Sequence, residues 1–250
     1  MKIGIAVVDY GNPEYLKECL HSLNIDNSEV FDSRIFDCNI QNIGFTAANN
    51  NLIKDYLSFK PGWQPDWIWL LNNDTIVPAD TIQSIIDKLP EIEVSATINK
   101  NGVSDFGIVG FQIRSIENPD LIHHAGTQQC FPAGIHKSGS VKFNQFNVRT
   151  FERWVTFASV LIRREVFETI GLLDETFFNI CSDSDFCYRA RAAGFKVIYE
   201  PSFMIYHHIG QSQTPSPEMQ EIHQRDIANF QNKWLNGKLY FDLDHELMGN

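Results

Sequence analysis

Apolar residues fall into short runs and helical stripes that alternate along the chain, which predicts an α/β fold. Runs typical of strands cover residues 2–8, 33–39, 67–71, 107–114, 156–163 and 196–199, and the last is expected to end at Pro201. Helices are predicted over residues 14–23, 46–57, 81–89, 164–170, 183–193 and 218–234. Residues 121–150 are expected to be irregular or hairpin-like. Because strands alternate with helices in the first half, we expect βαβ units and a mostly parallel sheet.

A sheet of this kind binds its ligands at the carboxyl ends of its strands. Three polar segments follow predicted strands, at residues 9–10, 72–74 and 207–208. The second is the most informative, because the five apolar residues 67–71 predict a strand that is buried on both faces. Asp74 lies just past its end, where a carboxylate can hold Mg²⁺ or Mn²⁺ together with substrate phosphates. The alternative is that Asp74 caps a turn before Pro78, and this segment alone leaves both interpretations open.

Two carboxylates, Asp183 and Asp185, lie where a helix is predicted to begin. Acidic residues in the first turn of a helix are favoured by its dipole, and Asp185 has the i,i+4 spacing of an ordinary ion pair with Arg189. The functional interpretation makes one of the two acids a general base that removes a proton from an acceptor hydroxyl.

Two histidine pairs and a glycine loop are weaker candidates. His207 and His208 follow a predicted strand, and at most one of them is expected to serve a site because adjacent side chains point in different directions. His123 and His124 form a similar pair in a less informative region. Gly44 permits a tight turn before a helix whose first amides open toward a ligand, although a plain helix cap is the alternative.

Composition narrows the class of protein. With 250 residues, 43% of them hydrophobic, the chain can bury a sizeable core in one domain or one domain with a small annex. A net charge of -11 argues against nucleic-acid binding, and an acidic protein that binds phosphates needs a metal or a helix N-terminus. Five scattered cysteines suit a reducing compartment. No signal peptide or membrane span is predicted, so a soluble, cytoplasmic protein is expected.

Seven motifs together carry a family resemblance. They are AVVDYGNPEYLKECLHSL, NIGFTAANN, WLLNNDTIVP, GIVGFQIRSIENPDLIHHAG, LIRREVFETIGLLDETFF, SDSDFCYRARAAGFKVIYEP and the turn His207-His208-Ile209-Gly210. In this order the sequence resembles the GT-A-fold, family 2 glycosyltransferases, especially the bacterial rhamnosyltransferase-like members that build surface polysaccharides. The resemblance runs from Lys2 to Trp234. It implies a Rossmann-like, mostly parallel central sheet flanked by helices, with a small antiparallel annex.

The resemblance implies a role for each matching residue. Asp74 matches the main ligand of the family's DxD-type metal element, with Asn72 in place of its first carboxylate, and His207 completes the site. The implied cofactor is Mn²⁺ or Mg²⁺. Asp183 matches the catalytic base, and Asp185 a second acidic position that is expected to be structural. The residues that match the nucleotide site are Val8, Asp9, Tyr10, Asn42, Gly44, Asn72 and Asn73.

Three departures from the family pattern concern the donor. The second strand is expected to be shortened, and Asp26 is assigned to recognition of the base. Phe157-Ala158 replaces the usual Gly-Ala step that faces the donor sugar, so Phe157 either narrows the sugar pocket or turns into the core. Ser182 replaces the usual Glu before the base, which reduces the local charge.

The implied reaction is the inverting transfer of a sugar from dTDP-rhamnose or a UDP-sugar to a glycan or lipid-linked glycan acceptor. Residues 1–250 are expected to form a single domain, with a nucleotide-binding half (1–110), an acceptor and catalytic half (111–212) and a helical tail (213–250). The tail is expected to contact the acceptor, the inner face of a membrane or a second copy of the chain. The alternatives are a non-catalytic carbohydrate-binding scaffold on the same fold, and a nucleotidyltransferase, which is less favoured because residues 9–13 lack Lys and Arg.

Overall fold

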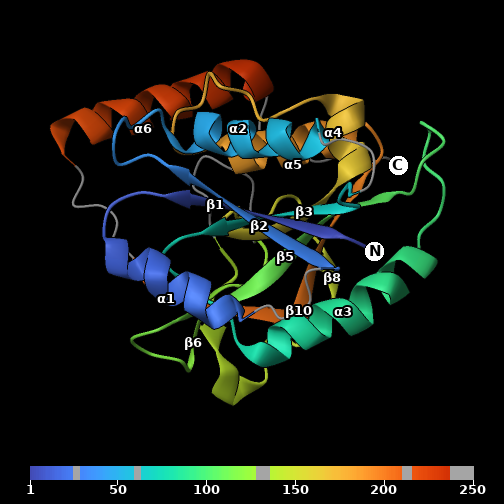
Figure 1. Cartoon of the computed structure of the whole chain (residues 1–250). Helices are drawn as coiled ribbons and strands as arrows, with labels where there is room; N and C mark the ends of the chain where they lie inside the picture. The colour runs from blue at the N-terminus through green and yellow to red at the C-terminus, as the bar shows by residue number, and fades with distance from the viewer. Residues whose placement is uncertain (25–28, 59–62, 128–135, 210–215, 237–250) are drawn as a thin grey trace.

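One mixed β-sheet forms the centre of the molecule, with helices on both of its faces (Figure 1). The structure, a computed structural model, describes residues 1–24, 29–58, 63–127, 136–209 and 216–236. The strands of the main path lie in the order β2 (Phe31–Asp37), β1 (Ile3–Asp9), β3 (Trp67–Asn72), β9 (Ser159–Arg163), β5 (Phe106–Ser115), β10 (Lys196–His207) and β4 (Thr75–Ile76).

The sheet is mostly parallel, as the sequence predicts. Strand β1 is parallel to both β2 and β3, and β10 is parallel to β5. Strand β9 is antiparallel to its two neighbours, β3 and β5, so β5 and β10 run in the same direction as β1. The carboxyl ends of five strands therefore lie along one edge of the sheet, where ligands of such folds bind.

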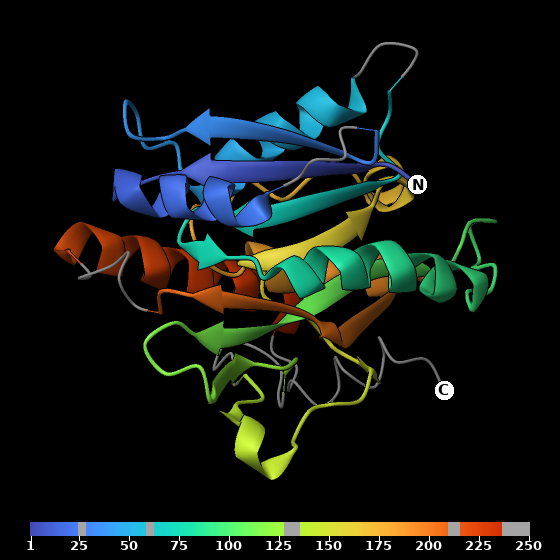
Figure 2. The ribbon, with the colours of Figure 1, turned by 60° about the horizontal axis from the view of Figure 1, so that its bottom comes forward.

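A small antiparallel annex extends the sheet beyond β5 and β10. It contains β6 (Leu121–His124), β7 (Gly139–Ser140), β8 (Thr150–Phe151) and a short 3₁₀ turn, Val141–Phe143. Figure 2 shows β2, β1 and β3 one below the other in the upper part of the view, with the annex at the bottom. The expected hairpin-like character of this region is confirmed by the pairing of β6 with β7.

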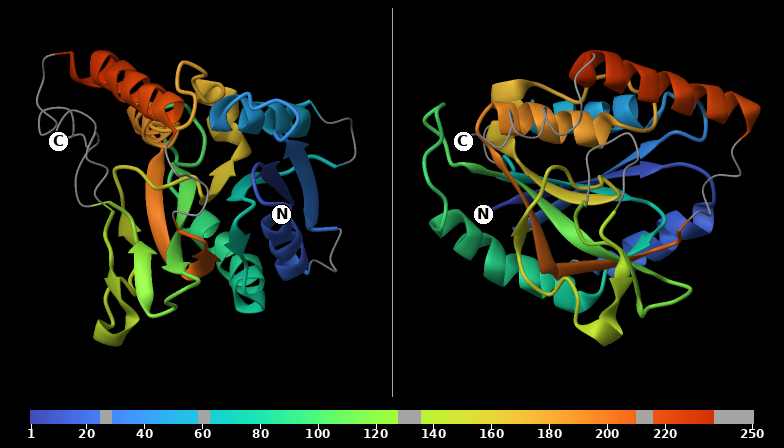
Figure 3. Two further views of the ribbon diagram at one scale, coloured as in Figure 1. Left: turned by 90° about the vertical axis from the view of Figure 1, so that its left-hand side faces the viewer. Right: turned by 180° about the vertical axis from the view of Figure 1, so that it is seen from behind.

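Two apolar cores hold the helices against the sheet. The side chains of β3 alternate between them, with Trp67 and Trp69 on one face and Ile68 and Leu70 on the other, and all four are fully buried. Helices α1 (Pro13–Leu23) and α3 (Ala79–Val94) cover the first face. The second face carries α2 (Phe45–Leu57), α4 (Arg164–Ile170), α5 (Ser182–Ala192) and α6 (Pro217–Phe230), which a π-helical turn, Gln231–Leu235, follows (Figure 3).

Two expectations about strands are wrong. Strand β10 does not end at Pro201 but continues to His207, because a register shift between Glu200 and Met204 accommodates a residue that cannot donate to the ladder. Strand β2 is complete, since its seven residues pair with β1 from Phe31 to Asp37. No helix within the described residues is long and apolar enough to cross a membrane.

Candidate active site

Asp74 and His207 meet at the carboxyl edge of the sheet. Asp74 lies in the tight turn between β3 and β4, and His207 is the last residue of β10, opposite Thr75. The antiparallel pairing of β10 with β4 brings the His207 Nε2 atom to 2.9 Å from the Asp74 Oδ1 atom. The His208 amide donates to the Asp74 carbonyl at 3.0 Å and fixes the same turn. Two residues that are 133 positions apart in sequence thus form one polar pair.

The Asp74–His207 pair fits a divalent cation. Neighbouring ligands of an octahedral ion at about 2.1 Å lie about 3.0 Å apart, and the separation of Nε2 and Oδ1 is 2.9 Å. Both side chains are largely buried, with 4% of Asp74 and 16% of His207 exposed. Within the described ranges, no group of three or more His, Cys, Asp or Glu side chains is arranged to hold a metal. A cation held by these two side chains alone would take its remaining ligands from phosphate oxygens and water.

A second polar cluster surrounds Asp9 at the end of β1. The Asn39 Nδ2 atom donates to one Asp9 oxygen at 2.9 Å, and the Asn73 Nδ2 atom donates to the other at 2.9 Å. Asn73 also donates to the Tyr10 carbonyl at 3.0 Å. Asp9 is therefore held by two amides, and Asn73 acts as a support for Asp9.

Sequence reasoning missed the end of β2. Asp37 lies opposite Asp9 in the register, and its carboxylate accepts from the Asn39 amide at 2.7 Å. Charged residues such as Asp32 and Arg34 hide the bounds of β2 in the sequence. In the structure, Arg34 pairs with Asp32 and lies over the Tyr56 ring at 4.4 Å. Had the strand been bounded correctly, the rule on carboxyl ends would have found Asp37. Asp26, assigned to base recognition, lies outside the described residues.

A pocket opens beside these two clusters. Gly44 directly precedes α2 and has a φ of +87°, a backbone conformation that residues with a side chain rarely adopt. A Cβ atom on Gly44 would lie 2.6 Å from the Phe178 carbonyl oxygen, so the close approach requires glycine. The pocket is lined by Val8, Tyr10, Cys38, Asn42, Gly44, Phe45, Asn72, Asn73, Asp74, Phe178, Asn179 and Met219. It gathers most of the predicted nucleotide residues, and adds Phe178, Asn179 and Met219, to which no role was assigned from the sequence.

Asp183 lies half-buried in the first turn of α5, where its Oδ1 atom accepts from the Ser184 amide at 2.7 Å. Burial raises the pKa of Asp183 to about 6, although hydrogen bonds from the backbone amides of Ser184, Asp183 and Phe157 act to lower it. A carboxylate with such a pKa is ionised at neutral pH and still basic enough to accept a proton, as a general base requires.

The segment Phe157–Ala158 connects Asp183 to the end of β3. The Phe157 amide faces the Asp183 carboxylate, and the Ala158 carbonyl accepts from the Asn72 amide at 2.9 Å. The Phe157 side chain is 1% exposed and packs edge-on against Phe186 at 5.9 Å. It is therefore turned into the core, the second of the two expected alternatives, and it does not narrow a sugar pocket. The backbone of this segment contacts both Asp183 and the end of β3.

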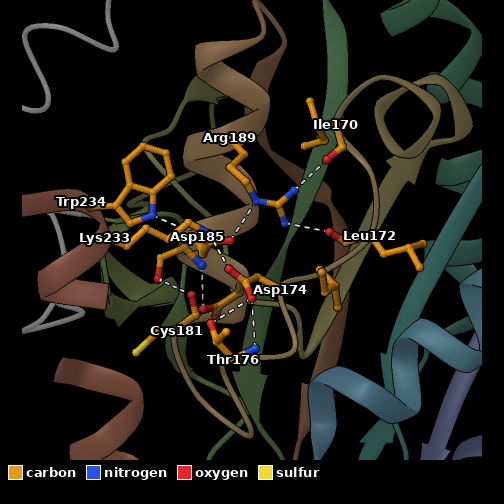
Figure 4. A network of polar contacts seen from close by, with 12 residues as sticks. Ile170, Leu172, Asp174, Thr176, Cys181, Asp185, Arg189, Lys233 and Trp234 are labelled. Carbon is orange, nitrogen blue, oxygen red and sulfur yellow. Dashed lines mark hydrogen bonds and ion pairs between the residues drawn. The ribbon is translucent and has the colours of Figure 1, made fainter. Parts of the chain in front are cut away.

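Asp185 is enclosed by donors (Figure 4). Its Oδ1 atom accepts from Trp234 Nε1 at 2.8 Å and lies 2.8 Å from Lys233 Nζ, and its Oδ2 atom accepts from Arg189 Nε at 2.9 Å. Arg189 also donates to two loop carbonyls, at 3.0 and 2.8 Å. A fully buried carboxylate with three such partners holds structure together, so Asp183 is the acid that remains available for chemistry.

The other histidines occupy distinct positions. His208 stacks on Tyr15 with ring centroids 4.5 Å apart, and its Nδ1 atom lies 3.3 Å from Glu117 Oε1. His124 is fully buried, and its Nδ1 atom lies 2.6 Å from that of His136. Burial lowers the pKa of both His124 and His136, which favours neutral rings, one of which donates to the other.

No protein-family model matches the sequence, but the fold is similar to that of solved glycosyltransferase structures. GalNAc-T7, solved with UDP, GalNAc and Mn²⁺, superposes with a TM-score of 0.61 at 11% identity, over 86% of this chain and 45% of that chain. TarS 1-349 of S. aureus, in complex with UDP-GlcNAc, superposes with a TM-score of 0.57 at 11% identity, over 99% and 72%. The chain has the GT-A glycosyltransferase fold.

Two sequence relatives of this GT-A chain are rhamnosyltransferases. Rhamnosyltransferase WbbL of Escherichia coli (strain K12) is 24% identical over 230 residues, which cover 82% of this chain and 82% of WbbL. The N-acetylglucosaminyl-diphospho-decaprenol L-rhamnosyltransferase of Mycobacterium tuberculosis is 24% identical over 183 residues, or 70% of this chain and 59% of the relative. A match of 32% identity to protein y4gI of Sinorhizobium fredii covers 83 residues and 9% of that protein. The resemblance to rhamnosyltransferase-like GT-A enzymes is confirmed.

Proposed function

We propose that the protein is an inverting glycosyltransferase that moves a sugar from a nucleoside diphosphate sugar to a glycan acceptor. The observation that carries the proposal is the meeting of the Asp74–His207 pair with the pocket lined by the ends of β1 and β3. The segment Phe157–Ala158 connects the end of β3 to Asp183, whose pKa is raised by burial to about 6. The two relatives that are rhamnosyltransferases favour dTDP-rhamnose as donor, with a UDP-sugar as the alternative.

In this proposal the nucleoside lies in the pocket beside Gly44. Its base and ribose face the polar cluster of Asp9, Asn39 and Asp37, which offers carboxylate oxygens to N–H and O–H donors. Gly44 and Phe45, at the start of α2, line the pocket, and no acidic side chain lies in the first turn to compete with an anion. Since the protein carries a net charge of -11, this helix end and a cation supply the attraction for phosphates.

Asp74 and His207 would hold Mn²⁺ or Mg²⁺ against the diphosphate. When bound, such a cation supplies Lewis-acid stabilisation of the charge that develops on a leaving phosphate. The chain itself supplies two ligands fixed by the pairing of β10 with β4. The structure of GalNAc-T7, which was solved with Mn²⁺, lends support to a metal at this edge of the fold.

Asp183 takes the proton of an acceptor hydroxyl as the oxygen attacks the anomeric carbon from the face opposite the leaving group. The C–O bond to the acceptor forms as the bond to the nucleoside diphosphate breaks, so the configuration inverts without a covalent intermediate. General-base assistance is typically worth about 10²–10⁴-fold in rate. Buried surroundings keep the Asp183 carboxylate basic, and the amides of Ser184 and Phe157 fix its orientation.

The acceptor proposed from the resemblance is a glycan or lipid-linked glycan of a bacterial surface polysaccharide. His123 lies on β6, which pairs with the end of β5. The same end of β5 pairs with the end of β10 at His207. This placement supports an acceptor path between the annex and Asp183, open to an acceptor presented at a cytoplasmic membrane face.

The scaffold alternative loses its two sequence arguments. Strand β2 is complete, and Phe157 is turned into the core, so neither feature blocks the donor site. A thermal-shift panel of nucleotide sugars with Mn²⁺ tests the proposal first, because the correct donor raises apparent stability by mass action. Hydrolysis and transfer of the best donor are then measured by chromatography, with Asp183→Asn as the inactive control. Donor binding without turnover by the wild type would favour the scaffold, and absence of binding by every donor would refute the proposal.

A further inference from the structure

A single carboxylate of α6 holds the loop that joins α4 to α5. Asp226 is fully buried, and its Oδ2 atom accepts from the amides of Phe178, Asn179 and Ile180 at 3.0, 2.8 and 3.1 Å. Its Oδ1 atom accepts again from the Phe178 amide at 3.0 Å. Three consecutive amides thus converge on one side chain, 46 to 48 residues away along the chain.

The turn after α6 contacts the same loop near its start, at Asp174 (Figure 4). Lys233 Nζ lies 2.5 Å from Asp174 Oδ2 and 2.8 Å from Asp185 Oδ1, so one ammonium joins the loop to α5. Although burial acts to raise it, hydrogen bonds from Lys233 and Thr176 lower the pKa of Asp174 to about 2. Trp234 donates to Asp185 at 2.8 Å. The segment 217–235 is therefore bound to the loop through Asp226 and Lys233, and to α5 through Lys233 and Trp234.

This loop connects the two parts of the proposed site. Phe178 and Asn179 line the nucleotide pocket, and the Phe178 carbonyl accepts from the Thr46 amide at 3.3 Å at the start of α2. The loop ends at Cys181, which adopts φ +70°, two residues before Asp183. A left-handed backbone at a residue other than glycine persists only where the surroundings hold it.

Burial of Asp226 is costly unless its bonds compensate for the lost water. Arg225 is the cation that approaches it, at 3.5 Å, while each amide of the loop lies at 3.1 Å or less. The carboxylate is thus matched to the conformation of the loop rather than to a salt bridge. Apolar packing alone would not require a buried carboxylate at this position.

We propose that Asp226 is a positioning residue for the transfer reaction, which holds loop 174–181 so that Phe178 shapes the nucleotide pocket and Asp183 faces the acceptor. Lys233 and Trp234 complete this function by fixing α5 through Asp185. The inference rests on the proposed function, because positioning has meaning only if Asp183 and the pocket take part in one reaction. It makes the segment after β10 part of the catalytic apparatus.

The experiment compares Asp226→Asn with Glu221→Gln in the full chain. Both change an acid to its amide on α6, but Glu221 is exposed and lies outside the loop contacts. Trp234→Phe is the second variant, which removes one hydrogen bond to Asp185 and keeps the aromatic ring. Measurements are kcat and the donor KM, and amide hydrogen exchange of residues 178–180, which needs no turnover.

We expect Asp226→Asn to exchange at least tenfold faster at residues 178–180, with kcat at least tenfold lower and a raised donor KM. Trp234→Phe should lower kcat with the donor KM unchanged, because its partner is on α5 and not in the pocket. Glu221→Gln should match the wild type. An active wild type with unchanged kcat and KM in both test variants would overturn the inference and leave the proposed function intact. Unchanged exchange at residues 178–180 in Asp226→Asn would also overturn it. A wild type inactive with every donor would overturn the proposed function and, with it, this role for Asp226.

Discussion

Replacement of Asp183 by Asn tests both the site and its electrostatics. Burial raises the pKa of Asp183 from 3.8 to about 6, and a shift of about 2 units corresponds to about 3 kcal/mol. The folded state disfavours the charged form of Asp183, and this determines how its contribution to stability changes with pH. Since the folded pKa is raised, the contribution of Asp183 to stability is fully present below pH 3.8 and is lost as the pH rises through about 6. The Asn variant has no charge to bury and should lack this loss.

Urea unfolding at about pH 4.5 and about pH 7.5 measures the effect. Because the unfolded carboxyl is already largely ionised at the lower pH, about 2 of the 3 kcal/mol should be lost between the two conditions. The wild type should therefore lose about 2 kcal/mol more than Asp183→Asn over this interval. Comparing each protein with itself cancels the change in hydrogen bonding that the amide introduces.

The same variant should bind the donor normally, because Asp183 is not among the residues that line the nucleotide pocket. Its turnover should fall by about 10²–10⁴-fold, and the wild-type kcat should rise with pH through about 6. Calorimetry with the donor and a transfer assay separate the two. Equal pH dependence of stability in both proteins, or turnover near that of the wild type, would refute the assignment of Asp183 as a buried base.

Three further substitutions test other parts of the site. Asp74→Ala should abolish Mn²⁺-dependent nucleotide binding in calorimetry, and an affinity that does not change would contradict a metal at this position. Gly44→Ala should destabilise the fold by roughly 1–3 kcal/mol and weaken donor binding, because its Cβ would lie 2.6 Å from the Phe178 carbonyl. Gly171→Ala, at a similar φ of +78° but with open space, is its control for backbone strain alone. Phe157→Ala should cost about 3–5 kcal/mol in thermal or urea unfolding with an unchanged donor preference, and a switch in donor would place that ring in the pocket.

Buried strands were the most predictable part of the fold. Residues 67–71 are all fully or nearly fully buried, and a run of five apolar residues can be stable only between two layers. The end of β10 was not predictable, because Pro201 normally stops a strand and the bulge that accommodates it depends on the neighbouring β5. For β2, ion pairs and a ring contact made by Arg34 compensate for polar side chains on an edge strand.

Single candidate residues could be named from the sequence, and their roles in the site stay predictions. Asp74, His207 and Asp183 follow strand ends or begin a helix, so position in the sequence indicates them. Partners from distant segments were not predictable, because Asn39 is 30 residues from Asp9 in the sequence and Trp234 is 49 residues from Asp185. The core position of Phe157 depends on Phe186 and was left open by the sequence for the same reason.

The antiparallel strand β9 has a consequence for the biogenesis of the chain. It closes the gap between β3 and β5, and its residues 159–163 follow β3 by about 90 positions. Until β9 arrives, one edge of the apolar strand β3 has unpaired backbone N–H and C=O groups, and such an edge readily pairs with other chains. An N-terminal fragment that ends before β9 should therefore aggregate rather than bind nucleotide. Because β9 pairs with β3, residues before and after the annex share one central ladder, and we expect neither part to fold without the other.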